Sequence, residues 1–162
     1  MFNRIIVPLD GSPFAEQALE IACGLAKPLN LPIHLIRVTD LYPLHLGSYI
    51  DYTGYAETDR LIAEDALAYL KGVEERLKTQ GQTVSFEVLR GVAADQVTAA
   101  AGKDDLIVMS SHGRSGVVRW FMGSVAEDVM RRGKGSVLLH RVQTAESTAS
   151  LDSSTSHSLV VE

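Results

Sequence analysis

The sequence predicts an α/β fold: a three-layer, open twisted sheet of five parallel strands with helices on both faces. Short apolar runs rich in β-branched residues alternate along the chain with segments whose apolar residues recur at helical spacing. Continuous apolar strands of this kind are typical of parallel sheets that are covered on both faces. The length of 162 residues suits one domain with a sizeable core.

The first strand and the first helix have clear boundary signals. The run RIIVPL, residues 4–9, is short and apolar and ends at Asp10 and Gly11, which predicts a buried strand. Ser12 then provides an N-cap, and Pro13 suits the first helical position. Seven apolar residues follow at helical spacing: Ala15, Ala18, Leu19, Ala22, Leu25, Ala26 and Leu29.

Four further strands and three helices complete the pattern. We expect strands over residues 33–38, 84–88, 105–110 and 136–141, and helices over residues 63–77, 93–101 and 124–132. Residues 39–55 are polar and aromatic, with tyrosines at positions 42, 49, 52 and 55 and no clear period. A connection of this length is often functional. Three interpretations of this segment stay open: an ordinary variable loop, a segment that closes over a nucleotide, or a segment that packs on a second subunit.

Composition and charge exclude several classes of partner. The formal net charge of −5 argues against nucleic acid and anionic membranes, which need a concentrated positive field. The single cysteine, Cys23, excludes an intrachain disulfide and is expected to be a small buried hydrophobe in the first helix. No run approaches the ~18 apolar residues of a membrane span, and the N-terminus lacks a secretory apolar region. The expected location is the reducing cytoplasm.

The composition changes after Val142. Residues 143–162 contain nine Ser or Thr, no Lys or Arg, and three acids. The acids contribute −3 to the charge, which leaves −2 for the preceding residues. We therefore expect a folded domain over residues 1–142 and a disordered tail over residues 143–162.

Two loops leave the carboxyl ends of predicted strands: PLDGS, residues 8–12, and SSHGRSG, residues 110–116. In open parallel sheets, ligands bind beyond these ends, at the point where the strand order reverses. If the two strands are neighbours, both loops face one crevice. Its floor would then consist of Pro8, Leu9, Asp10, Met109 and Ser110.

The second loop has the composition of an anion-binding segment. Gly113 and Gly116 permit positive φ angles and a close approach of the backbone. Gly123 and Ser124 begin a predicted helix, whose free N–H groups and positive dipole end favour phosphate. Arg114 offers a charge-assisted contact. A Gly- and Ser-rich turn that merely leads into a capped helix explains the same residues, so both interpretations stay open at this point.

The segment from Met109 to Arg132 resembles the signature of the universal stress protein family. Members that bind ATP have Gly-x2-Gly-x9-Gly followed by Ser or Thr, and here nine residues separate Gly113 from Gly123 and Ser124. The opening RIIVPLDGS, the closing VLLHR and the strand–helix order are also similar to the family. The resemblance covers about residues 3–142. It implies a Rossmann-like domain, similar in fold to adenine nucleotide alpha-hydrolases, that binds ATP with Mg²⁺.

The resemblance also implies roles for individual residues. Asp10 would lie near the ribose or a phosphate-bound Mg²⁺, with Pro8 and Leu9 beside it, and Val38 would pack on adenine. The other implied nucleotide-binding positions are Met109, Ser110, Ser111, His112, Gly113, Arg114, Gly116, Gly123, Ser124 and Val125. Taken without the resemblance, Asp10 also fits a purely turn-forming role ahead of Gly11.

One position departs from the family pattern, because the first glycine of the signature falls on Ser110. A serine there either crowds the nucleotide or donates its hydroxyl to a phosphate or ribose oxygen. The family has branches that bind ATP and branches that do not. This chain keeps Gly113, Gly116 and Gly123, which favours binding.

Other residues whose side chains could bind metals or take part in catalysis have simpler interpretations. His112 has no neighbouring carboxylate in the sequence, and the five histidines show no metal-ligand spacing, so a loop histidine bonded to the backbone is favoured. Asp104 and Asp105 precede their strand and are expected in a solvated turn at its amino end. Trp120 is expected in the core, with an exposed anchor for a partner as the alternative.

These observations predict a nucleotide-dependent stress-response or regulatory protein. The segment lacks a convincing general base or nucleophile, which favours sensing over turnover, although slow ATP hydrolysis through Mg²⁺ and positioning stays open. One alternative is an interaction module of the family that binds no nucleotide. Another is an adenylating enzyme, whose Ser-Gly-Gly-x-Asp-Ser or His-x-Gly-His loops are absent here. The apolar strand over residues 136–141 is expected to pair with its counterpart in a homodimer, as the family implies.

Overall fold

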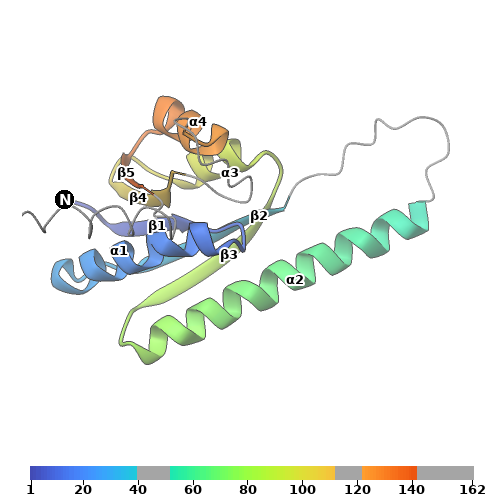
Figure 1. Ribbon diagram of the computed structural model, residues 1–162, viewed down its shortest axis with the longest axis horizontal. Coiled ribbons are helices and arrows are strands. Elements are labelled where there is room, and N and C mark those ends of the chain that lie inside the picture. The colour runs from blue at the N-terminus through green and yellow to red at the C-terminus, as the bar shows by residue number, and fades with distance from the viewer. Residues whose placement is uncertain (40–51, 112–121, 142–162) are drawn as a thin grey trace, which may run out of the picture.

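The computed structural model describes residues 1–39, 52–111 and 122–141. These residues form alternating strands and helices, as predicted (Figure 1). The elements are β1 (Arg4–Pro8), α1 (Pro13–Leu29), β2 (Ile33–Thr39), α2 (Tyr52–Thr79), β3 (Val84–Arg90), α3 (Ala93–Ala100), β4 (Asp105–Ser110), α4 (Ser124–Arg132) and β5 (Ser136–His140).

The described strands form one parallel sheet in the order β3-β2-β1-β4-β5. The chain adds β2 and β3 on one side of β1 and then crosses to add β4 and β5 on the other side. The strand order therefore reverses between β1 and β4, which pair directly, with Ile6 opposite Ile107. The expectation that these two strands are neighbours is confirmed.

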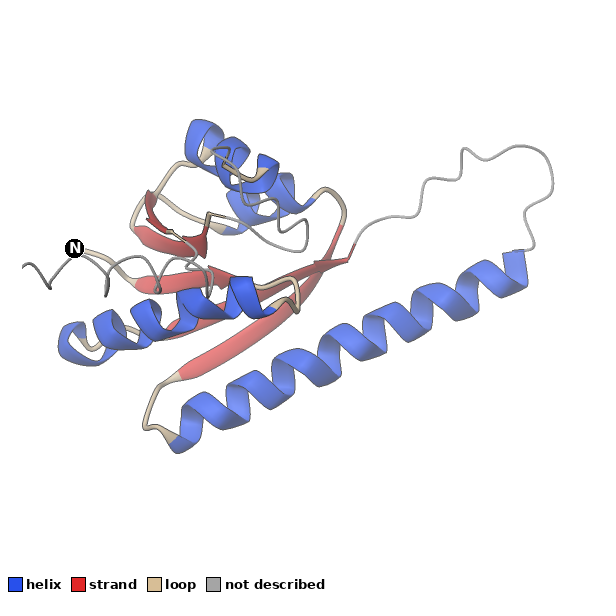
Figure 2. Ribbon diagram, in the orientation of Figure 1, coloured by secondary structure: helices blue, strands red, loops and turns tan. Residues whose placement is uncertain are grey.

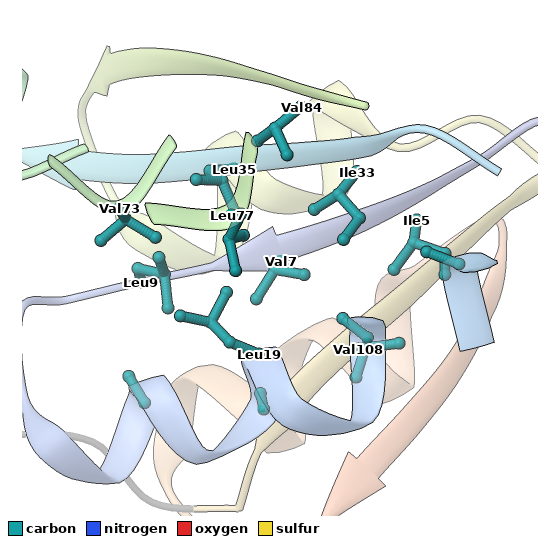
Figure 3. Packing of buried hydrophobic residues seen from close by; sticks show 14 of the residues in the cluster. Ile5, Val7, Leu9, Leu19, Ile33, Leu35, Val73, Leu77, Val84 and Val108 are labelled. Atoms are coloured by element: carbon teal, nitrogen blue, oxygen red, sulfur yellow. The ribbon is translucent and has the colours of Figure 1, made fainter. Parts of the chain in front are cut away.

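Helices cover both faces of the sheet, which gives the predicted three layers (Figure 2). On one face, α1 and α2 enclose a core that includes Val7, Leu35, Leu77 and Val108 (Figure 3). On the other face, α3 and α4 pack over a second cluster that includes Ile107. Neighbouring strand residues enter different clusters because successive side chains of a strand point to opposite faces.

The first half of α2 was not predicted. Residues 52–55 were expected in a loop, but α2 begins at Tyr52. The second half of the helix is buried at Ala66, Leu70, Val73 and Leu77, whereas residues 56–65 are largely exposed. An exposed helix needs no apolar period, and Arg60 instead pairs with glutamates three residues before it and four residues after it. This half extends beyond the end of the sheet in Figure 1.

Two side chains lie differently from the expectation. Asp105 is buried rather than solvated, accepts a hydrogen bond from the Gly102 N–H at 2.9 Å, and pairs with Arg4 at 3.1 Å. Burial by itself would raise its pKa, but the bond from Gly102 and the charge of Arg4 hold the pKa of Asp105 below its usual value. Cys23 is half-buried at the edge of the core, and desolvation raises the pKa of its thiol.

Several sequence-based expectations lie outside the described residues. They concern the connection over residues 40–51, the loop that contains His112 and Trp120, and the segment 143–162. Within the described ranges, no helix combines the length and the apolar character that crossing a bilayer requires.

Candidate functional site

The turn between β1 and α1 forms one side of the candidate site. The Asp10 carboxylate accepts a hydrogen bond from the backbone N–H of Ser12 at 2.9 Å, which closes a tight turn. Gly11, between them, has a φ of +84°, in the left-handed region that glycine adopts without strain. Asp10 therefore has the turn-forming role that the sequence allowed. It also lies just beyond the carboxyl end of β1.

The start of α4 lies beside the carboxyl end of β4. The N–H of Gly123 donates to the carbonyl of Ser111 at 2.8 Å, and the N–H of Ser111 donates to the carbonyl of His140 at 2.8 Å. The first bond attaches the N-terminus of α4 to the end of β4, and the second joins this end to β5. The structure thus brings together Asp10, Ser110, Ser111 and Gly123 at one end of the sheet.

The helices that follow the two central strands, α1 after β1 and α4 after β4, differ in how their first turns are satisfied. In α1, the Ser12 hydroxyl accepts the Ala15 N–H at 3.1 Å, and Pro13 has no N–H to offer. In α4, the N-cap is Gly123, and no side chain of the described residues caps the first turn. The first backbone N–H groups of α4 are therefore the better donors for an external anion, and the helix dipole adds to this preference.

The side chain of Ser110 does not point toward the expected nucleotide position. Its hydroxyl donates to the backbone carbonyl of Phe14 in α1 at 2.7 Å, and its side chain is buried. Val108, two residues earlier in β4, belongs to the core under α1. Ser110 therefore faces α1 and links β4 to the first turn of that helix, so its hydroxyl is already engaged within the protein.

The apolar residues expected at the floor of the crevice divide between the two faces of the sheet. Leu9 is 3% exposed and packs in the core under α1 and α2, so its backbone is the part closest to the crevice. Met109 is buried and Val38 half-buried in the cluster beneath α3 and α4. Pro8 is half-buried, whereas Ser124 and Val125 at the start of α4 are exposed. The described residues thus combine largely buried apolar side chains with exposed residues at the start of α4.

A metal ion would have few protein ligands at this site. Among the described residues, no three His, Cys, Asp or Glu side chains lie close enough together to hold an ion. Asp10 supplies one carboxylate, which belongs to the turn itself. Mg²⁺ usually binds one or two carboxylates together with water and substrate phosphates, so a single carboxylate fits a Mg²⁺ that arrives with a nucleotide.

Arg37, beneath the turn, is a residue that sequence reasoning missed. Its side chain is 10% exposed, pairs with Asp65 of α2 at 3.1 Å, and lies over the ring of Tyr69 at 4.9 Å from the centroid. The signal was present in the sequence, because Arg37 follows the apolar Leu35 by two residues and so shares its buried face. Four other expected residues, His112, Gly113, Arg114 and Gly116, lie outside the described residues.

Comparisons with known proteins agree with this architecture. The sequence model of the universal stress protein family matches residues 1–141. The chain is 30% identical over 141 residues to universal stress protein MJ0531 of Methanocaldococcus jannaschii, an alignment that covers 86% of this chain and 82% of that protein.

Two solved structures show that the fold is shared. The structure of protein MJ0577 of M. jannaschii has a TM-score of 0.78 and 22% identity, and the match covers 90% of this chain and 99% of that one. A universal stress protein in complex with cAMP has a TM-score of 0.62 and 23% identity, with coverage of 88% and 98%.

Proposed function

Because this chain belongs to the universal stress protein family, we propose that it binds ATP, as a complex with Mg²⁺, at the carboxyl ends of β1 and β4. The site would use the turn at Asp10 on one side and the start of α4 on the other. A solved family member is a complex with cAMP, which supports an adenine nucleotide as the class of ligand.

The observation that carries this proposal is the start of α4. Gly123 gives the helix an N-cap without a side chain, and its N–H bond to Ser111 places the uncapped turn beside the end of β4. The phosphates would bind these backbone N–H groups, while the hydroxyl of Ser124 would add a donor. The loop residues Ser111, His112, Gly113, Arg114 and Gly116, together with Val125, would complete the phosphate side of the site.

The base and ribose would lie on the side of β1 and β2. The half-buried Val38 offers apolar surface in the layer of α3 and α4, in the same cluster as the buried Met109 and next to Pro8 and the backbone of Leu9. Asp10 would contact the ribose or a Mg²⁺ bound to the phosphates. Ser110 is compatible with this arrangement, because its side chain faces α1 and its hydroxyl is bonded to the carbonyl of Phe14.

The proposed biological role is nucleotide-dependent regulation in a stress response. No metal-ligand cluster was found among the described residues. The residues assigned to the site position a nucleotide through backbone donors and one carboxylate. Binding that changes the state of the protein fits this set of groups better than rapid turnover, which normally adds a positioned base or nucleophile.

The proposal includes a homodimer that forms through β5. In the described residues, β5 is the last strand of the sheet beside β4, and four of its five residues are half-buried. An apolar edge strand favours pairing with another strand. We also propose that residues 1–142 form the folded domain, since the family match ends at residue 141.

The first experiment is to denature the purified protein and identify any released nucleotide by chromatography. Release of ATP or ADP supports the proposal, and formation of ADP during incubation with fresh ATP would reveal slow hydrolysis. Release of pyrophosphate on addition of a small acid or amine would instead support an adenylating enzyme. A protein that carries no nucleotide and gains none from ATP would favour an interaction module.

A further inference from the structure

Arg37 occupies an unusual position for an arginine. It lies near the carboxyl end of β2, on the face that Leu35 directs into the core, and its side chain is only 10% exposed. Moving a charged group out of water is costly unless other groups compensate for the lost hydration. The surroundings of Arg37 therefore indicate what the guanidinium group does in this protein.

On one side, Arg37 contacts α2. Its Nη2 lies 3.1 Å from a carboxylate oxygen of Asp65, and its Cζ lies 4.9 Å from the centre of the Tyr69 ring. Asp65 is 74% exposed, so this ion pair alone contributes little to stability. The aromatic ring adds a cation–π contact in a partly buried setting. Both contacts connect β2 to the middle of α2.

On its other side, Arg37 packs against the turn of the candidate site. A Cβ atom placed on Gly11 would lie 3.4 Å from Nη1 of Arg37, so the guanidinium group borders the side of this glycine on which a side chain would otherwise lie. Gly11 lies between Asp10 and Ser12, the two residues joined by the hydrogen bond that closes the turn. Arg37 thus occupies the space between this turn and α2.

We propose that Arg37 is a positioning residue that holds the Asp10–Gly11 turn against α2 and so sets the geometry of the nucleotide site. The guanidinium group does not contact the ligand in this proposal. It supports the backbone that presents Asp10. The link to nucleotide affinity rests on the proposed function, whereas the support of the turn can be measured without any nucleotide.

The same region offers a matched control in Arg76. The hydroxyl of Tyr69 donates to Glu16 at 3.0 Å, and Arg76 pairs with the other oxygen of Glu16 at 2.6 Å. Arg76 therefore also connects α2 to α1 through a carboxylate. Its side chain is 50% exposed, and it is not among the groups closest to Gly11. Arg76→Met makes the same chemical change as Arg37→Met without removing the support of the turn.

The test compares Arg37→Met, Arg37→Lys and Arg76→Met by two measurements. The first is hydrogen exchange of the Ser12 amide in nucleotide-free protein, followed by NMR, because this N–H closes the turn. The second is the Kd for Mg-ATP. We expect Arg37→Met to accelerate Ser12 exchange about tenfold and to weaken binding about tenfold, and Arg76→Met to change either by less than about twofold. Arg37→Lys keeps the charge without the planar fork and should lie between.

Each result decides a separate part of the proposal. Unchanged Ser12 exchange in Arg37→Met would overturn the support of the turn, whether or not the protein binds nucleotide. Faster exchange with unchanged Mg-ATP affinity would overturn the link to the site. If the unmodified protein binds no Mg-ATP, the proposed function fails, and the exchange measurement alone decides the role of Arg37. Methionine retains the unbranched apolar stem, so the core should tolerate the change.

Discussion

The hydroxyl of Ser110 donates a hydrogen bond to the carbonyl oxygen of Phe14 at 2.7 Å, across the boundary between β4 and α1. The signature of ATP-binding family members has glycine at the position of Ser110, and the sequence left open whether serine there crowds or binds a nucleotide. The structure shows a third arrangement, in which the side chain joins a strand of the candidate site to the first turn of the neighbouring helix.

Removal of this hydroxyl should affect stability more than binding. Ser110→Ala loses one buried hydrogen bond, so we expect the free energy of unfolding to fall by about 1 kcal/mol. The Kd for Mg-ATP should change by less than about threefold, since the hydroxyl faces α1. Urea denaturation and calorimetric titration measure the two effects. A large loss of affinity at unchanged stability would show that Ser110 contacts the nucleotide.

Substitution of Gly123 should abolish nucleotide binding while the fold persists. Gly123 has φ −61° and ψ 143°, angles that any residue adopts, so Gly123→Val should leave the backbone intact. Its side chain would cover the first N–H groups of α4, and we expect affinity to fall by at least about a hundredfold. Titration of Mg-ATP into the variant measures the loss.

Gly24→Ala is the control for this substitution. Gly24 lies in α1, and a Cβ there meets no atom within 4 Å. The change should stabilise the protein by up to about 1 kcal/mol through helix propensity and leave affinity unchanged. Equal affinity of Gly123→Val and the unmodified protein would place the phosphates elsewhere.

The stability of the protein should fall as the pH decreases through the range of histidine titration. Burial and the nearby Arg4 lower the pKa of His34 from its ordinary value of 6.5, with Glu87 acting in the opposite direction. As the pH falls below 6.5, His34 binds a proton more readily in the unfolded chain than in the folded chain, so the free energy of unfolding decreases. Asp105, with a lowered pKa, adds a loss of the same sign at more acidic pH.

His34→Gln separates these two contributions. Glutamine can still bond to the hydroxyl of Ser85, which lies 2.9 Å from Nδ1 of His34, but it does not titrate. Urea denaturation at several pH values should show a smaller decrease between neutral and mildly acidic pH for the variant than for the unmodified protein. Identical pH profiles would rule out His34 as the cause.

A change confined to one edge of β5 should disrupt the proposed dimer. The carbonyl of His140 accepts from Ser111, so this residue directs its backbone groups toward β4. Backbone groups of consecutive strand residues alternate between the two edges, and Val137, three residues earlier, therefore presents its N–H at the opposite edge. Val137→Pro removes that N–H without removing a bond to β4.

Sedimentation equilibrium should show a dimer for the unmodified protein and a monomer for Val137→Pro at micromolar concentration. Circular dichroism of the variant checks that the sheet is retained. A variant that stays dimeric with an intact sheet would show that the chains associate through another surface.

The fold was predictable because its signals are local. Most strands are short apolar runs, β3 alternates apolar and polar residues, and α1 has both an N-cap at Ser12 and a regular apolar stripe. The first half of α2 was missed because its residues are exposed and stabilised by pairs such as Arg60 with Glu64. A segment without a buried face has no apolar period to detect.

The position of the candidate site could be proposed from the sequence, but its internal contacts could not. The glycines and Asp10 indicated which strand ends form the site, and the pairing of β1 with β4 agrees with this. Sequence spacing could not show that Ser110 faces Phe14 or that Arg37 lies beneath Gly11. Both contacts join residues far apart in the chain, and their direction depends on the packing of α1 and α2 against the sheet.

The central claim is tested most directly by calorimetric titration of Mg-ATP into protein that has been stripped of nucleotide. The proposed site predicts saturable binding at a single site per chain, with a Kd below the millimolar range. Absence of a binding signal at millimolar Mg-ATP, in protein whose fold is intact, would contradict the proposal.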